Sequence, residues 1–443
     1  MKKFGFLLSA LVLAGTSLFA QNPIIRDQFS ADPSALVVGD KVYVFPSHDI
    51  KAPAEYGRKD WFCMADYHVF SSSNLTDWTD HGMIVDQWTA PWVNEKGYSM
   101  WAPDCKFHNG KYYFFFPAGA KPQPSANGRR GMGGNRVGIA TADYPEGPYT
   151  PEATPIEGVG GIDPCIFVDD DGRAYLFWGN KGCWYGELNP DMISFKNGFK
   201  EVPGFHDPKC FGPAVMKMNW GKGEMEMMVG YEEGPWVMKR NGIYYMSYPA
   251  GGVPEHMAYS TAKNINGPWT YGDKIMEIAP NSFTIHGGNV NFKGHDYMFY
   301  HSGMLPNGNS YRRSACVEEF KFNPDGSIPF IPFSEEAVAP VGTLNPYNRV
   351  EGETMAQSFG VKNDRLAGTR HYVTSIHAGD WICIREVDFG TTQPKELTAE
   401  VLNVKNAGRA EFYLDTLYIQ EKRVRPIATI NVEEGGSTVI TAP

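Results

Sequence analysis

The stretch Cys105-Lys-Phe-His-Asn-Gly-Lys-Tyr-Tyr113 joins a short apolar run to an aromatic run through a turn at Gly110. A turn between two such runs predicts a β-hairpin. The same arrangement occurs five times in the first three hundred residues. The hairpins place aromatic residues at Tyr43, Tyr113, Tyr175, Tyr245 and Tyr297.

These tyrosines are 70, 62, 70 and 52 residues apart, and a second motif follows other predicted strands. Its three copies are Asp77-Trp-Thr79, Gly147-Pro-Tyr-Thr150 and Gly267-Pro-Trp-Thr270. Each unit is long enough for a four-stranded sheet with its loops, so five units predict a five-bladed β-propeller. A large β-sandwich is the alternative.

Composition supports an all-β protein and excludes some functions. The 443 residues include 40 Lys and Arg against 50 Asp and Glu, a net charge of −10. This balance argues against electrostatic binding of nucleic acid. With 42% hydrophobic and 20% charged residues, the chain is too apolar to be disordered. Its 48 Gly and 32 Pro favour short strands and tight turns.

The seven cysteines are odd in number and form no CxxC pair, which argues against zinc and thioredoxin-like chemistry. Disulfide pairing stays open, with buried free thiols as the default.

Residues 1–20 have the pattern of a secretory signal peptide. Lys2 and Lys3 precede an apolar stretch, and Ala20 ends a plausible cleavage site before Gln21. A membrane anchor is the alternative, but the apolar run is too short to span a bilayer with ease. We therefore expect a periplasmic or extracellular protein without membrane insertion.

One position in each repeat unit stands 11 or 12 residues before the hairpin tyrosine. These positions are Asp32, Ala102, Asp163, Glu233 and His286. Equivalent positions of all blades converge on the propeller axis, so three carboxylates and a histidine are expected to share one funnel. Each residue alone is also typical of a solvated turn, because Asp before Pro is common there. The equal spacing favours a shared site.

Four segments around these positions carry a family resemblance. They are Phe29-Ser-Ala-Asp-Pro-Ser-Ala35, Met100-Trp-Ala-Pro-Asp104, Gly161-Ile-Asp-Pro-Cys-Ile-Phe167 and Glu233-Gly-Pro-Trp-Val237. In this order and spacing they resemble glycoside hydrolase family 43 over roughly residues 22–330. The resemblance implies a five-bladed propeller that inverts configuration at the anomeric carbon.

By this resemblance Asp32 is the general base, Glu233 the general acid, and Asp163 the group that orients the acid and raises its pKa. Inverting glycosidases need such carboxyls roughly 6.5–9.5 Å apart, because a water must fit between them and the sugar. A negative Asp163 would raise the pKa of Glu233 by like-charge repulsion. Glu232 is the rival acid, but the repeat register and the following Gly-Pro favour Glu233.

The remaining site predictions concern a metal and the sugar. His286 matches the family's central histidine, which binds a metal, usually calcium; a histidine hydrogen-bonded in the channel is the alternative, since calcium prefers oxygen ligands. No organic cofactor is implied. Trp101 would stack on a sugar or pack in the core. Arg313, rather than Arg312, would contact the sugar or lie on the surface, and His48 would be structural or line the rim.

Beyond the propeller at 21–330, we expect a linker at 331–349 and a small β-sandwich at 350–443. Val350-Glu-Gly-Glu353 and the stretch from His377 to Gly390 resemble a family 6 carbohydrate-binding module. This resemblance implies a structural calcium near Glu351 or Glu353, as an alternative to one on the propeller axis. The module's usual closing strands are not found before Pro443, so it is expected to be truncated or incomplete.

The sequence thus predicts an exported, inverting, exo-acting glycosidase of plant cell-wall hemicellulose, a β-xylosidase or α-L-arabinofuranosidase or both, with an oligo- or polysaccharide as its partner. An endo-arabinanase or an exo-galactosidase of the same fold is an alternative. A non-catalytic glycan-binding propeller is another, and it would lack the three carboxylates. A metal-dependent enzyme is a third alternative. Oligomeric state stays open.

Overall fold

The computed structural model describes residues 22–122, 134–213, 215–219, 224–228, 230–367, 370–402, 405–414, 425–435 and 438–442. The expected signal peptide at 1–20 lies outside the described residues. Almost all regular structure in the described part is β, as predicted. Its helical segments are η1 (Ala54–Tyr56) and α1 (Pro208–Phe211).

Five antiparallel sheets, each with its strands in chain order, form the blades. Blade 1 comprises β1 (Ala31–Val38), β2 (Lys41–Ser47), β3 (Asp66–Ser72) and β4 (Trp78–Asp86). Blade 2 comprises β5 (Asp104–His108), β6 (Lys111–Gly119), β7 (Asn135–Ala142) and β8 (Thr150–Pro151). Blade 3 comprises β9 (Cys165–Val168), β10 (Ala174–Trp178), β11 (Trp184–Glu187) and β12 (Lys200–Glu201).

Blade 4 comprises β15 (Trp236–Arg240), β16 (Ile243–Ala250), β17 (His256–Ala262) and β18 (Thr270–Met276). Blade 5 comprises β19 (Asn289–Phe292), β20 (His295–Ser302) and β21 (Ser314–Phe320). A separate hairpin of β13 (Val215–Asn219) and β14 (Glu224–Met228) precedes blade 4 in the chain. All five predicted hairpins are present, and Gly110 and Gly242 adopt the positive φ angles that their turns need, 85° and 76°.

One hydrophobic cluster fills each gap between neighbouring blades. Side chains alternate along a strand, so β6 sends Phe114 and Phe116 toward blade 1 and Tyr113 and Phe115 toward blade 3. Five filled gaps close the ring, which confirms the five-bladed propeller and excludes the single large sandwich.

The first strand of each blade lies nearest the axis, because first strands contact one another around the ring: β1 meets β5 and β19, and β9 meets β5 and β15. The aligned positions of the sequence repeat therefore stand at one end of the axis. They are Asp32 in β1, Ala102 before β5, Asp163 before β9, Glu233 before β15 and His286 before β19.

The beginning of the described chain covers the outer edge of blade 5. The amide of Ile24 donates to the carbonyl of Ala315 at 2.8 Å, and the side-chain amide of Asn22 donates to the carbonyl of Val317 at 3.1 Å. The ring is thus closed by two segments from opposite ends of the catalytic domain.

The expected linker is tied to the propeller. Residues 331–349 form no strand, yet Ile331 and Val338 are buried in the core clusters on either side of blade 5. Immediately beyond it, β22 (Thr354–Met355) pairs with β4 and gives blade 1 a fifth strand. These first residues after 350 therefore belong to a propeller sheet.

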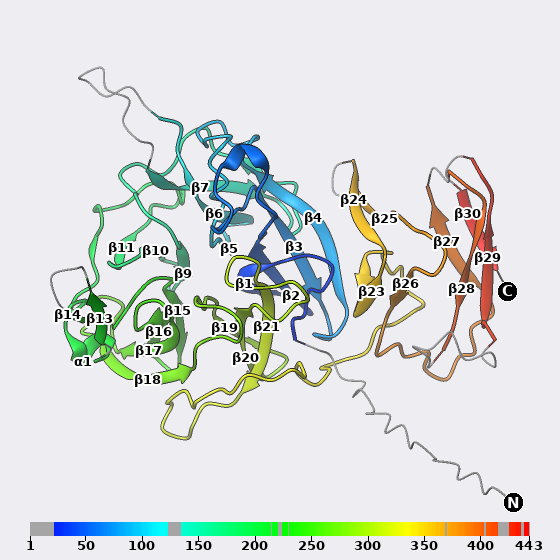
Figure 1. Cartoon of the computed structure of the whole chain (residues 1–443). Coiled ribbons are helices and arrows are strands. Elements are labelled where there is room, and N and C mark those ends of the chain that lie inside the picture. Colours follow the sequence, from blue (N-terminus) through cyan, green and yellow to red (C-terminus); the bar gives the residue numbers. More distant parts are fainter. Residues whose placement is uncertain are drawn as a thin grey trace, which may run out of the picture.

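The C-terminal domain consists of paired strands consistent with a small β-sandwich, and it lies beside blade 1 (Figure 1). The pairs are β23 (Gln357–Phe359) with β26 (Trp381–Cys383), β24 (Lys362–Ala367) with β25 (Arg370–Thr374), β27 (Leu397–Val401) with β30 (Thr438–Ala442), and β28 (Gly408–Phe412) with β29 (Ala428–Val432). The amide of Arg385 donates to Asp77 of blade 1 at 2.7 Å.

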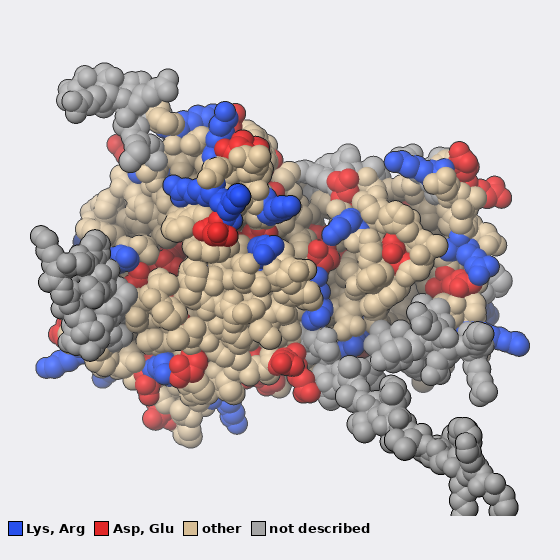
Figure 2. All heavy atoms as spheres, in the orientation of Figure 1, with Lys and Arg blue, Asp and Glu red and all other residues tan. Residues whose placement is uncertain are grey.

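All seven cysteines lie in described segments and are free thiols. The described residues include no helix of the length and apolarity that crossing a bilayer requires. On the face shown in Figure 2, lysine and arginine side chains are interspersed with acidic ones instead of forming one continuous patch.

Candidate active site

The predicted groups meet at the axis. Asp163, Glu233 and His286 each offer a polar atom within 4.8 Å of the other two. Glu232, the rival acid, is not in this group; its carboxylate lies 3.9 Å from the ammonium of Lys181. The geometry therefore favours Glu233 over Glu232, as the repeat register predicted.

Two of the carboxylates stand on unusual backbone. Asp32 and Asp163 have φ angles of 49° and 60°, in the left-handed region, although each precedes a proline that favours extended backbone. Such conformations cost about 1–3 kcal/mol and persist where the surrounding structure enforces them, often at functional sites.

Asp32 is buried and surrounded by donors. Arg313 donates from both terminal nitrogens, at 2.9 Å to Oδ1 and 3.2 Å to Oδ2, and Ser47 donates to Oδ2 at 2.6 Å. Burial raises the pKa of Asp32, but the Arg313 guanidinium, together with His301 and His286, outweighs burial and holds that pKa well below its usual range. Asp32 is therefore ionised at any pH at which the enzyme works.

The hydrogen bonds of His301 define its tautomer beside Asp32. Nδ1 of His301 accepts the amide of Asp32 at 3.1 Å, and Nε2 lies 3.0 Å from the carbonyl of Thr284. These partners assign the ring proton to Nε2. Burial lowers the pKa of His301, which agrees with this neutral form. Its unprotonated Nδ1 then does not donate to Oδ1 of Asp32, 3.2 Å away.

Arg313 is a positioning residue. Its remaining donors go to Asp49, at 3.0 Å from Nε and 3.1 Å from Nη2, and to the Thr284 hydroxyl at 3.4 Å. Because all five donors have protein acceptors and the residue is 3% exposed, the predicted contact of Arg313 with the sugar is not supported. Arg313 acts through Asp32.

Glu233 has a contrasting environment. Its Oε2 accepts one hydrogen bond, from the side-chain amide of Asn180 at 2.6 Å. Burial raises the pKa of Glu233 to about 7; the Asn180 amide opposes this shift, and the charge of Asp32 adds to it. A carboxyl with this pKa holds a proton near neutrality, as a general acid must.

Asp163 is buried beside Glu233 and accepts the amide of Gly234 at 3.2 Å. Burial, followed by the charge of Glu233, raises the pKa of Asp163 well above its usual range. We expected a negative Asp163 to be the cause of the raised pKa of Glu233. The largest cause of that rise is burial, and the charges that add to it are those of Asp32 and Glu232.

His286 packs against the backbone next to the acid. Gly234 has a φ of 58°, and a Cβ there would lie 2.7 Å from the His286 ring. Burial lowers the pKa of His286 to about 4, so its ring is neutral and keeps a free lone pair. Asp163 and Glu233 alone do not form a calcium cage, since calcium takes six to eight oxygen ligands.

Aromatic residues line one side of the site. Trp101 is half-buried, so the structure gives it both core packing and an accessible edge. Phe62 contacts Trp101 and lies 4.7 Å below the Arg313 guanidinium. Beyond Phe62, the rings of Tyr311 and Trp61 continue outward, and Trp61 is 40% exposed. Sequence reasoning missed this wall, although Asp-Trp-Phe in the long β2–β3 connection was a signal.

His48 is placed away from the axis group. Its Nδ1 lies 2.6 Å from Asp66 of β3, and its ring packs edge-on against His68. Of the two predicted roles for His48, this arrangement fits the structural one.

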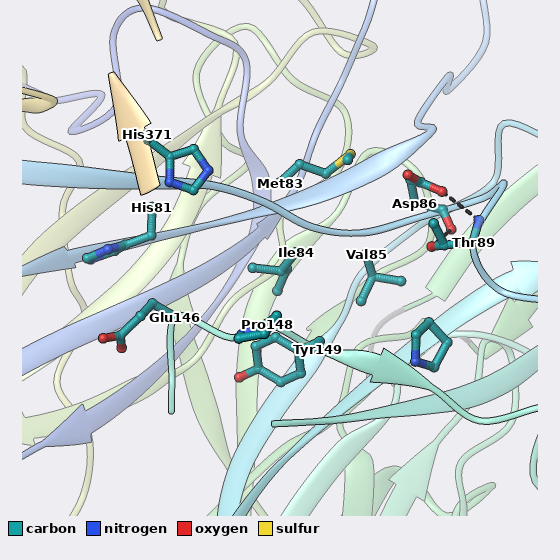
Figure 3. Close-up of a pocket in the computed structure, with 11 residues that line it drawn as sticks. His81, Met83, Ile84, Val85, Asp86, Thr89, Glu146, Pro148, Tyr149 and His371 are labelled. Carbon is teal, nitrogen blue, oxygen red and sulfur yellow. Dashed lines mark hydrogen bonds between the residues drawn. The ribbon is translucent and has the colours of Figure 1, made fainter. Parts of the chain in front are cut away.

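A separate cavity of about 210 Å³ contains none of the predicted residues. Figure 3 shows β4 on one side of it, Glu146 to Tyr149 on the other, and His371 of the C-terminal domain above. It lies between the outer strands of blades 1 and 2, away from the carboxyls.

The comparison with known families agrees with this site. The family model described as glycosyl hydrolases family 43 matches residues 20–328. This chain belongs to glycosyl hydrolases family 43. The chain is therefore a glycoside hydrolase, and the resemblance expected from the four segments is confirmed for the catalytic domain.

Relatives of this family 43 enzyme have named activities. The chain is 35% identical over 337 residues to the xylosidase/arabinosidase 43A of Humicola insolens, covering 69% of this chain and 98% of that one. The chain also matches a crystal structure of a family 43 β-xylosidase/α-arabinofuranosidase from a compost metagenome, in its calcium-free form with xylotriose. The TM-score is 0.58 and the identity 31%, over 71% of this chain and 97% of that one.

A third relative also matches the C-terminal domain. The Bacillus subtilis arabinoxylan arabinofuranohydrolase, crystallised with cellotetraose, has a TM-score of 0.75 and 27% identity. The match covers 95% of this chain and 90% of that one. The order of propeller and C-terminal β domain is thus shared with a known family 43 structure.

Proposed function

We propose that this enzyme releases xylose or arabinofuranose from hemicellulose by an inverting mechanism. The observation that carries the mechanism is the opposite protonation of two carboxyls at one axis: Asp32 is held ionised by Arg313, and Glu233 keeps a proton because it is buried. The substrate is supported by the relatives, whose names combine xylosidase and arabinosidase activities.

In this mechanism Asp32 takes a proton from water through Oδ1 while that water attacks the anomeric carbon. Glu233 gives its proton to the leaving oxygen on the opposite face of the sugar. Asn180 then stabilises the Glu233 carboxylate that results, because it donates to Oε2. Trp101 would stack on the bound sugar.

The test is hydrolysis of nitrophenyl β-xyloside, α-L-arabinofuranoside and β-galactoside by residues 21–443, with Glu233→Gln and Glu232→Gln as a matched pair. We expect activity on the first or second substrate, lost in Glu233→Gln and kept in Glu232→Gln. Proton NMR of the first-formed sugar should show the inverted anomer. Retention of configuration would contradict the mechanism. No hydrolysis of the three nitrophenyl glycosides, together with cleavage of arabinan, would indicate an endo-arabinanase.

A calcium ion at His286 is the metal that the family resemblance implies. We propose that His286 holds such an ion through its free nitrogen, with water as most other ligands, since direct carboxylate ligation would remove the Glu233 proton. The bound ion would supply positive charge beside the carboxyls. Calcium binding lost in His286→Ala supports this; unchanged calcium binding contradicts it.

We also propose that residues 1–20 direct export and are cleaved before Gln21, on the sequence pattern given above. N-terminal sequencing of the secreted protein should begin at Gln21. Recovery of the intact N-terminus from the cytoplasm would contradict this.

For residues 350–443 we propose a module of the family 6 carbohydrate-binding type, supported by the two sequence matches and the paired strands. If it binds sugar, Glu233→Gln should bind two xylo-oligosaccharides per chain. A stoichiometry of one, abolished by an active-site competitor, would limit binding to the funnel.

A further inference from the structure

A cluster of two imidazoles and a carboxylate lies on blade 1, outside the axis group. His48 follows β2, and Asp66 and His68 stand on β3. Each offers a ligand atom within 4.8 Å of the others. The side chains are 21%, 18% and 19% exposed, so an ion from solvent can reach them while most of its surroundings are protein.

The two rings converge on one oxygen. Nδ1 of His48 lies 2.6 Å from Oδ1 of Asp66, and Nε2 of His68 lies 4.0 Å from the same atom. Ligand atoms of a tetrahedral zinc site are about 3.4 Å apart, given bonds of about 2.0–2.2 Å. One distance is shorter than this and the other longer, and the two imidazole nitrogens lie within 4.8 Å of each other, so side-chain movements of about 1 Å would bring the three atoms to zinc geometry.

The outer partners of His68 fix the direction of its ring. Nδ1 of His68 lies 3.1 Å from Oδ1 of Asp80, which is 4% exposed. Asp80 is itself held by the amide of Gly82 at 2.7 Å and by the side chain of Gln28 at 3.0 Å. A metal-binding histidine usually donates a hydrogen bond from one ring nitrogen to a carboxylate. That bond orients the ring so that the other nitrogen faces the metal.

We propose that His48, Asp66 and His68 bind a divalent transition-metal ion, for which Zn²⁺ is the probe. Imidazole ligands suit zinc and its neighbours, whereas Ca²⁺ and Mg²⁺ prefer all-oxygen sites. Three protein ligands leave a fourth position for water. The lack of CxxC pairs in the sequence argues against zinc sites built from cysteines. The site proposed here has no cysteine ligand, so that argument does not apply to it.

The ion would tie together a segment that supports the general base. His48 stands between Ser47, which donates to Asp32, and Asp49, which binds Arg313. A metal at His48 would therefore fix the backbone that positions both groups. We assign the ion a structural role, because neither His48 nor His68 belongs to the axis group.

The test is titration of the metal-stripped mature chain with Zn²⁺, Co²⁺, Ca²⁺ and Mg²⁺. Calorimetry measures the stoichiometry and affinity, thermal unfolding measures Tm, and visible absorption reports the coordination of Co²⁺. We expect one Zn²⁺ per chain at this site, a higher Tm, and the visible absorption of four-coordinate Co²⁺. His48→Gln and Asp66→Asn should abolish that spectrum. Asp80→Asn should weaken Zn²⁺ binding about 10- to 100-fold, since it removes only the outer partner.

Two controls separate this site from other histidines. His295 makes a similar pair with Glu319 on the exposed surface, at 2.7 Å, so His295→Gln should leave the Co²⁺ spectrum unchanged. His286→Gln should also leave it unchanged. The proposal is overturned if His48→Gln, shown folded by circular dichroism, binds Zn²⁺ as wild type does, or if His286→Gln or His295→Gln removes the ion.

Discussion

The base side and the acid side of the funnel use the same functional group in opposite ways. Asp32 is enclosed by Arg313, Ser47 and His301, and its pKa falls despite burial. Glu233 has one neutral donor, Asn180, and its pKa rises to about 7. The comparison teaches that burial alone does not set a carboxyl's role, because a cation among its partners can reverse the direction of the pKa shift.

Removing either carboxyl should give the largest effect. We expect Asp32→Asn and Glu233→Gln each to lower kcat/KM by roughly 10²- to 10⁴-fold, the usual contribution of acid–base catalysis. The loss in Glu233→Gln should be larger for oligosaccharides than for nitrophenyl glycosides, because nitrophenolate leaves with less help from an acid. The loss in Asp32→Asn should be similar for both. Equal losses for the two substrates in Glu233→Gln would contradict the assignment of the acid.

Replacing Arg313 with a neutral residue should raise the pKa of Asp32, as burial raises that of Glu233. Arg313→Met leaves Asp32 and Asp49 buried without their partner, which should cost about 3–5 kcal/mol of unfolding free energy. The pKa of Asp32 should rise, so activity should be lost at low pH. Urea unfolding and pH–rate profiles measure both effects. Arg313→Lys keeps the charge and should show a smaller rise; an unchanged acid limb in Arg313→Met would refute this account.

The pH–rate profile of the wild-type enzyme should show the titration of Glu233 and not that of Asp32. Glu233 works protonated, so kcat/KM should fall about tenfold per unit as pH rises above its pKa of about 7. Asp32 works ionised. Because its pKa is lowered, kcat/KM should stay constant as pH falls below 7 until the protein unfolds. A base-side pKa between 4 and 7 in the wild-type profile would show that Arg313 does not control Asp32.

Removing the donor to the acid should shift the profile modestly. Asn180 stabilises the Glu233 carboxylate, so Asn180→Ala should raise the pKa of Glu233 and move the alkaline limb upward by about one unit. Asn291 makes the same kind of bond to Asp296 on the surface, at 2.9 Å, so Asn291→Ala should leave the limb in place.

The smallest effect should come from the aromatic wall. Trp61→Ala should raise KM for xylo-oligosaccharides by about two- to tenfold, the value of one stacking contact, with little change for nitrophenyl xyloside. Phe107 is 50% exposed at the far end of β5, so Phe107→Ala should change neither. An equal rise for both substrates in Trp61→Ala would place the ring at the cleaved sugar instead.

The sequence predicted the parts of this enzyme that repeat. Hairpins at fixed spacing indicated the blades, and their shared register placed Asp32, Asp163, Glu233 and His286 at one axis, because propeller symmetry turns equal spacing into proximity. The register also favoured Glu233 over Glu232.

Individual side-chain contacts could not be predicted in this way. Ser47 and His301 stand four residues after the hairpin tyrosines of blades 1 and 5, and Asn180 stands five residues after that of blade 3. Their roles depend on side-chain directions that spacing does not encode. Arg313 was assigned to the sugar from the family resemblance, and its sequence position gives no sign of Asp49 beside it. The pairing of β22 with β4 was missed because a two-residue strand carries no periodic signal.

Closure of the ring sets the order in which this protein can fold. The bond from Asn22 to Val317 joins residues 295 apart, and no blade can make it alone. Contacts of such separation form late and slow the folding of a chain. The ring must therefore stay open until the ribosome has made nearly the whole catalytic domain, and its last blade is completed by a segment synthesised before any of the blades.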